Sequence, residues 1–331
     1  MSDLEVREID PSEYGLWDDL VKSSPHGTIF HTSDWLIICR DVLDEDLKIY
    51  GCFKNDELVG GCSLFIRNIK GILKIASSTS KLTPYGGLVI KAFPNAKERI
   101  RVQETHKIMN SLREFLCDQN FDSMCITLSP NFLDVRPFTW NGWKSAVFYA
   151  YYVDLQSNID ENISKNIKRD IRKAREAKIN TKRFDDYKIF YDLFSMTFKR
   201  QNLKPPVPIE FFRRVFEFIE SKKIGYMLVS ETETSEVVAA HIRLYDKDKL
   251  CAWSAASNPD FRKAGSNTLL YYDEFKKLQG QKYSYMNMMA ANTPRFTNFI
   301  TGFNPKLVPY YSISWNTKKD VVLRRLCNVM K

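Results

Sequence analysis

The chain has 331 residues, of which 44% are hydrophobic and 13% aromatic, so it can bury a large apolar core and does not resemble a disordered protein. Its length exceeds the roughly 100–200 residues of one typical domain and favours two domains or one large one. The formal net charge of +9 favours anionic partners, among which CoA phosphates, nucleotide-linked compounds, RNA and anionic lipid all stay open.

The N-terminal sequence MSDLEVREID is acidic and lacks the basic patch and apolar core of a secretory signal. No apolar run reaches the ~18 residues that a membrane-spanning helix needs. We therefore expect a soluble, cytoplasmic protein without a transmembrane segment. The seven cysteines form no CxxC pair, and only two of the four histidines, His26 and His31, are near each other, so no metal site is expected.

The first half of the chain has the alternating strand and helix pattern of an α/β fold. The first two predicted helices cover 12–22 and a segment that starts near 32–33, and a strand hairpin follows over 47–53 and 57–67. A long amphipathic helix over 95–120 and a strand over 123–129 come next. The second half has three strands, a helix and a further strand: 224–230, 236–245, 250–257, 267–278 and 283–289.

The two halves also share short sequence patterns. ELVGGC (57–62) matches EVVAAH (236–241) in its charged, apolar and small positions. The turn NGW (141–143) precedes a tyrosine pair at 151–152, and TGF (301–303) precedes another at 310–311. An internal duplication explains these matches, with chance recurrence as the alternative, and predicts domains over 1–152 and 153–331.

A basic amphipathic helix joins the halves within 154–179. Its apolar positions form one stripe, made of Ile163, Ile167, Ile171 and Ala174, and its basic residues gather on the opposite side: Lys165, Lys168, Arg169, Arg172 and Lys173. This face is either solvated or a docking surface for an anionic substrate such as tRNA.

The segment FRKAGSNTLLYY (261–272) has the composition of an anion-binding helix start. Arg262, Gly265, Ser266 and Asn267 precede an apolar run. The first N–H groups of a helix are unpaired and lie at its positive end, and glycine allows close approach of a ligand to the backbone.

From about residue 223 to 315 the order of elements and this loop resemble the GNAT acyltransferase fold, in which an R-x-x-G-x-[GA] loop binds the CoA pyrophosphate. The last loop position here is Asn267. Two such halves in one chain resemble the FemAB-like group, which has tandem GNAT domains. Further stretches over about 15–315 resemble this group as well: GTIFHTSDW (27–35), the VDL and KRDIRKAREAKI segment (153–179), MTFKR (196–200) and PIEFF (208–212). The resemblance implies an α/β fold with mixed sheets and two GNAT-like domains in tandem.

The resemblance implies an acyltransferase that moves an acyl group from acetyl-CoA or another acyl-CoA to an amine of a small or nucleotide-linked acceptor. Arg262, Gly265, Ser266 and Asn267 would bind the donor, and Arg200 could hold a substrate phosphate, although it could also be an ordinary exposed arginine. Two alternatives remain: an aminoacyl-tRNA donor contacted through the basic helix 165–178, with an acceptor like a peptidoglycan precursor, or a non-catalytic FemAB-like binding protein.

Two side chains that this group tends to carry are missing. Ile300 occupies the place of a lysine, and Asn298 and Phe299 stand where many GNAT enzymes have a tyrosine that protonates the leaving thiolate. Tyr271, Tyr272 and Tyr310 are possible substitutes, and a free backbone N–H on the strand 250–257 is the expected oxyanion donor. We expect His31 and His241 to be structural, so no catalytic side chain is assigned.

Overall fold

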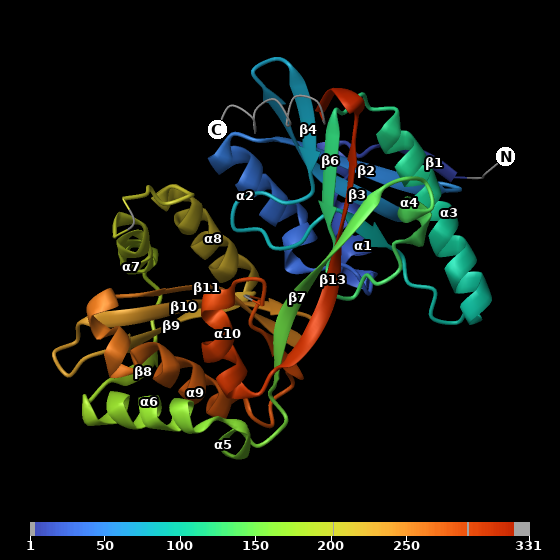
Figure 1. Ribbon diagram of the computed structural model, residues 1–331. Helices are drawn as coiled ribbons and strands as arrows, with labels where there is room; N and C mark the ends of the chain where they lie inside the picture. Colours follow the sequence, from blue (N-terminus) through green and yellow to red (C-terminus); the bar gives the residue numbers. More distant parts are fainter. Residues whose placement is uncertain (1–3, 201, 290, 321–331) are drawn as a thin grey trace. The chain divides into compact units, whose positions relative to one another are not determined.

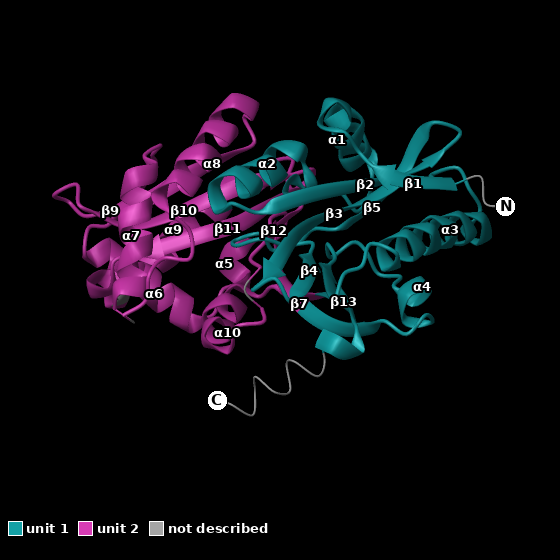
Figure 2. Ribbon diagram, turned by 90° about the horizontal axis from the view of Figure 1, so that it is seen from above, with its two compact units in different colours: residues 1–148, 309–331 teal, residues 149–308 magenta. Residues whose placement is uncertain are grey.

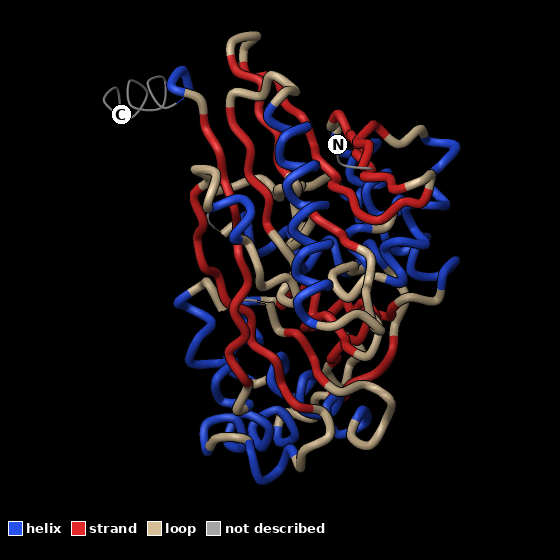
Figure 3. Tube along the Cα trace, turned by 90° about the vertical axis from the view of Figure 1, so that its right-hand side faces the viewer, coloured by secondary structure: helices blue, strands red, loops and turns tan. Residues whose placement is uncertain are grey.

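The computed structural model describes residues 4–200, 202–289 and 291–320. The chain divides into two compact units, residues 1–148 with 309–331 and residues 149–308 (Figure 2). Each contains a sheet with helices packed against it, and both units contain helices and strands mixed along the chain (Figures 1 and 3). None of the helices in the described ranges has the length and apolar character needed to cross a membrane.

In the first unit, strands pair in the order β1-β2-β3-β4-β6-β13, and β5 also pairs with β3. The strands are β1 (Leu4–Glu8), β2 (Asp46–Lys54), β3 (Glu57–Ile69), β4 (Leu73–Ser77), β5 (Leu88–Ile90), β6 (Ser123–Thr127) and β13 (Lys306–Asn316). The helices are α1 (Tyr14–Ser23), α2 (Ser33–Leu43), α3 (Glu98–Cys117) and α4 (Arg136–Thr139), preceded by the 3₁₀ turns η1 (Pro11–Glu13) and η2 (Ile29–His31).

Two consecutive glycines of β3 show how the helices cover this sheet. A Cβ atom at Gly60 would collide with Ile108 of α3, and one at Gly61 would lie 2.7 Å from the Trp17 ring of α1. Because successive strand residues face opposite sides of a sheet, α1 and α3 pack on opposite faces. Met109, Leu112 and Leu116 of α3 are fully buried in this core.

In the second unit, strands pair in the order β7-β12-β11-β10-β9-β8. They are β7 (Lys144–Asp154), β8 (Asn180–Arg183), β9 (Gly225–Glu231), β10 (Val237–Asp246), β11 (Lys249–Ser257) and β12 (Tyr285–Asn287). The helices and 3₁₀ turns are α5 (Ile159–Asn162), α6 (Lys165–Glu176), α7 (Tyr187–Lys199), α8 (Ile209–Lys222), η3 (Pro259–Ala264), α9 (Ser266–Leu278), α10 (Pro294–Ile300) and η4 (Thr301–Phe303).

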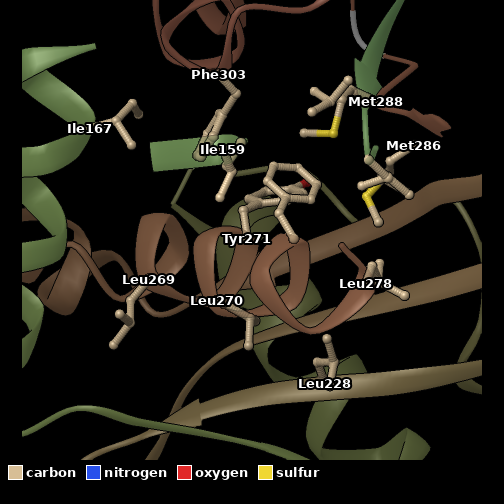
Figure 4. Packing of buried hydrophobic residues seen from close by; sticks show 14 of the residues in the cluster. Ile159, Ile167, Leu228, Leu269, Leu270, Tyr271, Leu278, Met286, Met288 and Phe303 are labelled. Carbon is tan, nitrogen blue, oxygen red and sulfur yellow. The ribbon is translucent and has the colours of Figure 1, made fainter. Parts of the chain in front are cut away.

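Helices cover both faces of this second sheet as well. The ring of Trp253 on β11 contacts Phe211 and Phe212 of α8, with centroids 6.3 and 5.9 Å apart. The preceding residue, Ala252, packs in the cluster that contains Leu269 of α9. Figure 4 shows this cluster, in which the Tyr271 ring of α9 lies 5.9 Å from the ring of Phe303 in η4. The cluster therefore fixes α9 on the sheet.

The same elements occur in both units, as the tandem GNAT prediction requires. The hairpin β2–β3 corresponds to β9–β10, α3 to α9, and the parallel pair β4/β6 to the parallel pair β11/β12. The glycine and alanine pairs of ELVGGC and EVVAAH lie on β3 and β10, the second strands of the two hairpins. The predicted α/β fold with two similar parts is confirmed.

The compact units differ from the predicted domains 1–152 and 153–331 because the last strand of each half is exchanged. Ser312 of β13 pairs with Thr127 of β6 in the first unit. Tyr152 of β7 pairs with Asn287 of β12 in the second unit. Sequence patterns identify the repeated halves but do not show which sheet each last strand joins.

The predicted basic helix within 154–179 is present as α6 (Lys165–Glu176), but a break separates it from the short helix α5 that precedes it. Ile163 is extended between α5 and α6, and the Ser164 hydroxyl caps α6 by accepting a hydrogen bond from the Ile167 N–H at 3.3 Å. The predicted apolar stripe is buried, with Ala174 fully inaccessible to solvent. Periodicity therefore located the buried face but missed the break.

Replacing Gly61 by alanine should destabilise the first unit by about 1–3 kcal/mol, because the new Cβ would lie 2.6 Å from the Tyr50 carbonyl oxygen as well as against Trp17. Urea unfolding followed by tryptophan fluorescence measures this effect. The matched control is Gly15→Ala in α1, where nothing lies within 4 Å of the added atom and no stability should be lost. Equal midpoints for the two variants would contradict the packing described for β3.

Candidate functional site at the start of α9

The loop between β11 and α9 forms a defined turn. The Asn258 side chain caps η3 by accepting a hydrogen bond from the Asp260 N–H at 3.1 Å. Gly265 has φ +77°, and a Cβ atom there would collide with the carbonyl oxygen of Asp170 in α6. Glycine is required here both by its backbone conformation and by the close approach of α6. The first N–H groups of α9 follow directly, at the end of the helix whose unpaired donors and positive dipole suit an anion.

The four loop residues predicted to bind the donor have different surroundings in the structure. Gly265 and Ser266 are buried, and the Ser266 hydroxyl has no hydrogen-bond partner in the described part of the chain. Arg262 lies in η3 by its backbone, and its side chain lies outside the described residues. The Asn267 side chain accepts a hydrogen bond from Nε2 of His241. It is therefore turned toward His241 on β10.

His241 belongs to a buried chain of polar groups that joins α9 to the sheet. Arg243 donates from Nη2 to Nδ1 of His241 at 2.8 Å, so the imidazole carries its proton on Nε2. Arg243 also contacts both carboxylate oxygens of Glu274, the closest at 2.7 Å, and the Tyr226 hydroxyl donates to Glu274 at 2.8 Å. The Arg243 and Glu274 side chains are 0% and 2% exposed. Burial, with Arg243 nearby, lowers the pKa of His241 well below its usual value and keeps the ring neutral.

Sequence reasoning missed this network. Arg243 is a charged residue at a buried position of the apolar strand 236–245, and Glu274 is a buried acid in α9. The signal in the sequence was a charged residue, Arg243, within an apolar strand pattern. This signal does not identify its partner Glu274, which lies 31 residues away in the sequence.

The strands β11 and β12 separate beside this loop. Their parallel pairing covers only Lys249↔Tyr285 to Cys251↔Asn287, whereas β11 continues to Ser257. A register shift against β10 lies between Ile242 and Leu244, where the separation begins. Among the described strands, none pairs with this edge of β11 beyond Cys251, so its backbone N–H groups can face a ligand. This is the geometry expected for an oxyanion donor on the strand 250–257.

Neither Ile300, which stands in place of the family lysine, nor any of the three candidate tyrosines is placed as a substitute proton donor. Ile300 is 4% exposed and belongs to the core. Tyr271 is buried with the Arg243 guanidinium 4.8 Å from its ring centroid, and Tyr272 donates to Asp160 at 2.7 Å. Tyr310 belongs to the first unit, where its ring packs 5.1 Å from Tyr85. No catalytic side chain is assigned from these contacts.

Two other predicted residues have simple environments. Arg200 is exposed at the C-terminal end of α7, with no ion pair among the described residues, and is available for a ligand. His31 is fully buried in the first unit, where its Nδ1 accepts a hydrogen bond from the Thr28 N–H at 3.2 Å. This is the structural role expected for His31. In the described ranges, no group of three or more His, Cys, Asp or Glu side chains is arranged to hold a metal ion.

A basic groove of about 330 Å³ lies beside α9. Its walls come from α5, α6 and α9: Asp160, Ile163, Lys168, Ile171, Arg172, Arg175, Glu176 and Tyr272. The Arg175 guanidinium lies 5.6 Å from the Tyr272 ring centroid. Lys276 donates to Asp160 at 2.8 Å and, with Tyr272, lowers the pKa of that carboxyl group. Three cations against two acids give the groove a positive charge, which suits an anionic ligand.

The geometry of the second unit is that of a GNAT acyltransferase domain, and residues 161–296 match the family model described as acetyltransferase (GNAT) domain. The whole chain has the FemAB-like tandem GNAT fold. It is similar to FemX with a TM-score of 0.68 and 12% identity, covering 96% of this chain and 98% of the other. A search of curated proteins gave no match.

Two further solved structures share the fold over nearly their full length. One is the C-terminal domain of a putative lysylphosphatidylglycerol synthetase from Agrobacterium fabrum, with TM-score 0.60, 11% identity and 95% of each chain covered. The other is a tandem GNAT protein from the clavulanic acid biosynthesis pathway, with TM-score 0.57, 11% identity, and 94% of this chain and 98% of the other covered. Identities this low establish the fold and leave the substrates open.

Lowering the pH from 7 to 5 should destabilise the protein less when His241 is replaced by glutamine, which keeps an N–H donor for Asn267. The folded-state pKa of His241 is lowered, so between that value and about 6.5 only the unfolded chain takes up this proton. Stability from this group is complete above about pH 6.5 and falls by up to about 1.4 kcal/mol per pH unit below it. Urea unfolding at pH 7, 6 and 5 compares the two slopes, and equal slopes would contradict a buried neutral histidine.

Proposed function

We propose that the protein is a cytoplasmic N-acyltransferase that binds an acyl-CoA at the start of α9 and transfers its acyl group to an amine of a small or nucleotide-linked acceptor. The observation that carries the proposal is the combination of two features in one unit. A helix start with a left-handed glycine at residue 265 lies next to a strand pair that separates after Cys251. The first feature suits the donor pyrophosphate, and the second leaves room for the acyl arm.

The reaction requires an unprotonated amine to attack the thioester carbon. A C–N bond forms, the C–S bond breaks, and the amine proton passes to the leaving thiolate. Backbone N–H groups on β11 beyond Cys251 are suited to stabilise the oxyanion, since they need no side chain. The role of Arg262, Gly265, Ser266 and Asn267 is to bind the donor, and exposed Arg200 is suited to a phosphate of the substrate.

Asn267→Asp should weaken CoA binding by roughly tenfold, about 1.4 kcal/mol, because it adds a negative charge in the first turn of α9 while keeping the acceptor for His241. Isothermal titration calorimetry with CoA measures the affinity. Gly265 is a poor site for this test, since any side chain there would displace α6.

The matched control is Gln279→Glu at the other end of α9, which makes the same charge change and should leave the CoA affinity within twofold. Absence of CoA binding by the unmodified protein, or equal affinities for the two variants, would overturn the placement of the donor at this helix start.

The basic groove beside α9 favours a second candidate, an aminoacyl-tRNA donor with an acceptor like a peptidoglycan precursor. Lys168, Arg172 and Arg175 line the groove together with Tyr272. Cationic side chains next to an aromatic ring suit a nucleic-acid strand, because phosphates pair with the cations and bases stack on the ring. With this donor the amine attacks the carbon of the aminoacyl ester, a C–N bond forms, the C–O ester bond breaks, and the amine proton passes to the leaving ribose oxygen of the tRNA.

If tRNA is the donor, replacing Lys168, Arg172 and Arg175 together by glutamine should lower tRNA affinity at least tenfold and reduce its salt dependence. Filter binding over a series of salt concentrations measures both. The control replaces three exposed lysines of the first unit in the same way: Lys22, Lys70 and Lys81. Equal losses in the two triple variants would indicate nonspecific attraction, and binding of neither donor would favour a non-catalytic FemAB-like protein.

A further inference from the structure

The first unit contains a cavity of about 650 Å³, within the roughly 300–1,000 Å³ of small-molecule sites. Its walls come from the first two turns of α3, from the segment 91–94 after β5, and from the segment 132–136 that leads into α4. Pro25, His26 and Tyr311 line the remaining side. All of these residues belong to the first unit, so the cavity is described within that unit alone.

The duplication gives this cavity a particular place in the fold. In the second unit the candidate donor site lies at the start of the helix that connects the parallel pair β11/β12. In the first unit the helix connecting the parallel pair β4/β6 is α3, and the cavity lies at its start. The cavity therefore occupies, in the first half, the position that the donor site occupies in the second.

The chemistry of the two positions differs. The residues before α3 are Phe93, Pro94, Asn95, Ala96 and Lys97, without the glycine that shapes the loop before α9. Glu98 stands in the first turn of α3, and its carboxylate already occupies the positive end of the helix. A phosphate would meet this negative charge, so the cavity does not suit CoA or another phosphorylated donor.

The charged side chains of the wall are paired with opposite charges. Lys91 pairs with Glu57, Arg101 pairs with Glu98, and Arg136 pairs with Asp134 at 2.8 Å. Asp134 is also bonded to His106 at 2.7 Å. A charged ligand would have to break one of these pairs, whereas an uncharged one would not.

The inner wall is apolar and partly aromatic. Phe132 and Val135 are 2% and 8% exposed, and the Phe132 ring lies 4.4 Å from the ring of His26. Leu133, which lines the same cavity, is 60% exposed. A ligand with an apolar body would cover this leucine and gain the free energy of burying it.

We propose that this cavity is a second ligand site, which binds an uncharged small molecule with an aromatic or acyl body. Half-buried Thr105, on the inner side of α3, supplies a hydroxyl that can orient a polar group of the ligand. The site is separate from the donor loop and does not depend on it.

The test uses N-phenyl-1-naphthylamine, an uncharged aromatic probe whose fluorescence rises in apolar surroundings, with the full chain. The expected result is saturable binding of one probe per chain that CoA does not displace. Val102→Trp, which fills the cavity from α3, should lower the affinity at least tenfold, whereas Ile100→Trp on the exposed side of α3 should leave it within twofold.

A second pair of variants guards against misfolding of Val102→Trp. Leu133 is exposed, so Leu133→Asp should fold normally and still weaken probe binding at least fivefold, while Leu16→Asp, at a leucine of α1 that is 50% exposed, should not. Nonsaturable binding, displacement of the probe by CoA, or equal affinities within both pairs of variants would overturn the proposal.

Discussion

The buried ion pair between Arg243 and Glu274 is the constraint on which the second unit depends. Two charges removed from water must satisfy each other, because an unpaired buried charge would cost several kcal/mol. The pair connects the middle of β10 to the middle of α9, and Tyr226 and His241 extend it to β9 and to Asn267. The helix start is thus held by bonds that also turn the Asn267 side chain toward His241. An apolar pair could anchor α9 equally well but could not orient an amide in this way.

A second constraint acts on the same helix start from the other side. The backbone of α6 approaches Gly265, and Ile167 of α6 approaches Gly302 in η4, so that any side chain at either glycine would collide. The basic helix and the candidate donor loop are therefore one packed body. This explains how a segment first noticed for its charge contributes to the geometry of the site.

Local patterns in the sequence were sufficient for much of the fold, including the helix start at which the candidate site lies. The alternation in 236–245 and 250–257 predicted β10 and β11, and glycine before an apolar run predicted the start of α9 at Gly265. What the sequence could not show depends on contacts between distant residues. The direction of the Asn267 side chain is set by His241, and the break at Ile163 depends on one serine cap. Strand β4, the parallel partner of β6, is only five residues long and was not predicted, since so short a segment has little periodicity.

The exchange of last strands has a consequence for the order of folding during synthesis. The first unit needs residues 312–316 of β13 beside β6, and the ribosome adds these residues only after the whole of the second unit, residues 149–308. Until then the edge of β6 exposes unpaired backbone groups, which is the kind of edge that recruits other strands. Cotranslational folding, which commonly lets an N-terminal domain finish first, cannot complete this one early. A chain that stalls before β13 emerges would thus hold an open sheet edge that a complete chain never exposes.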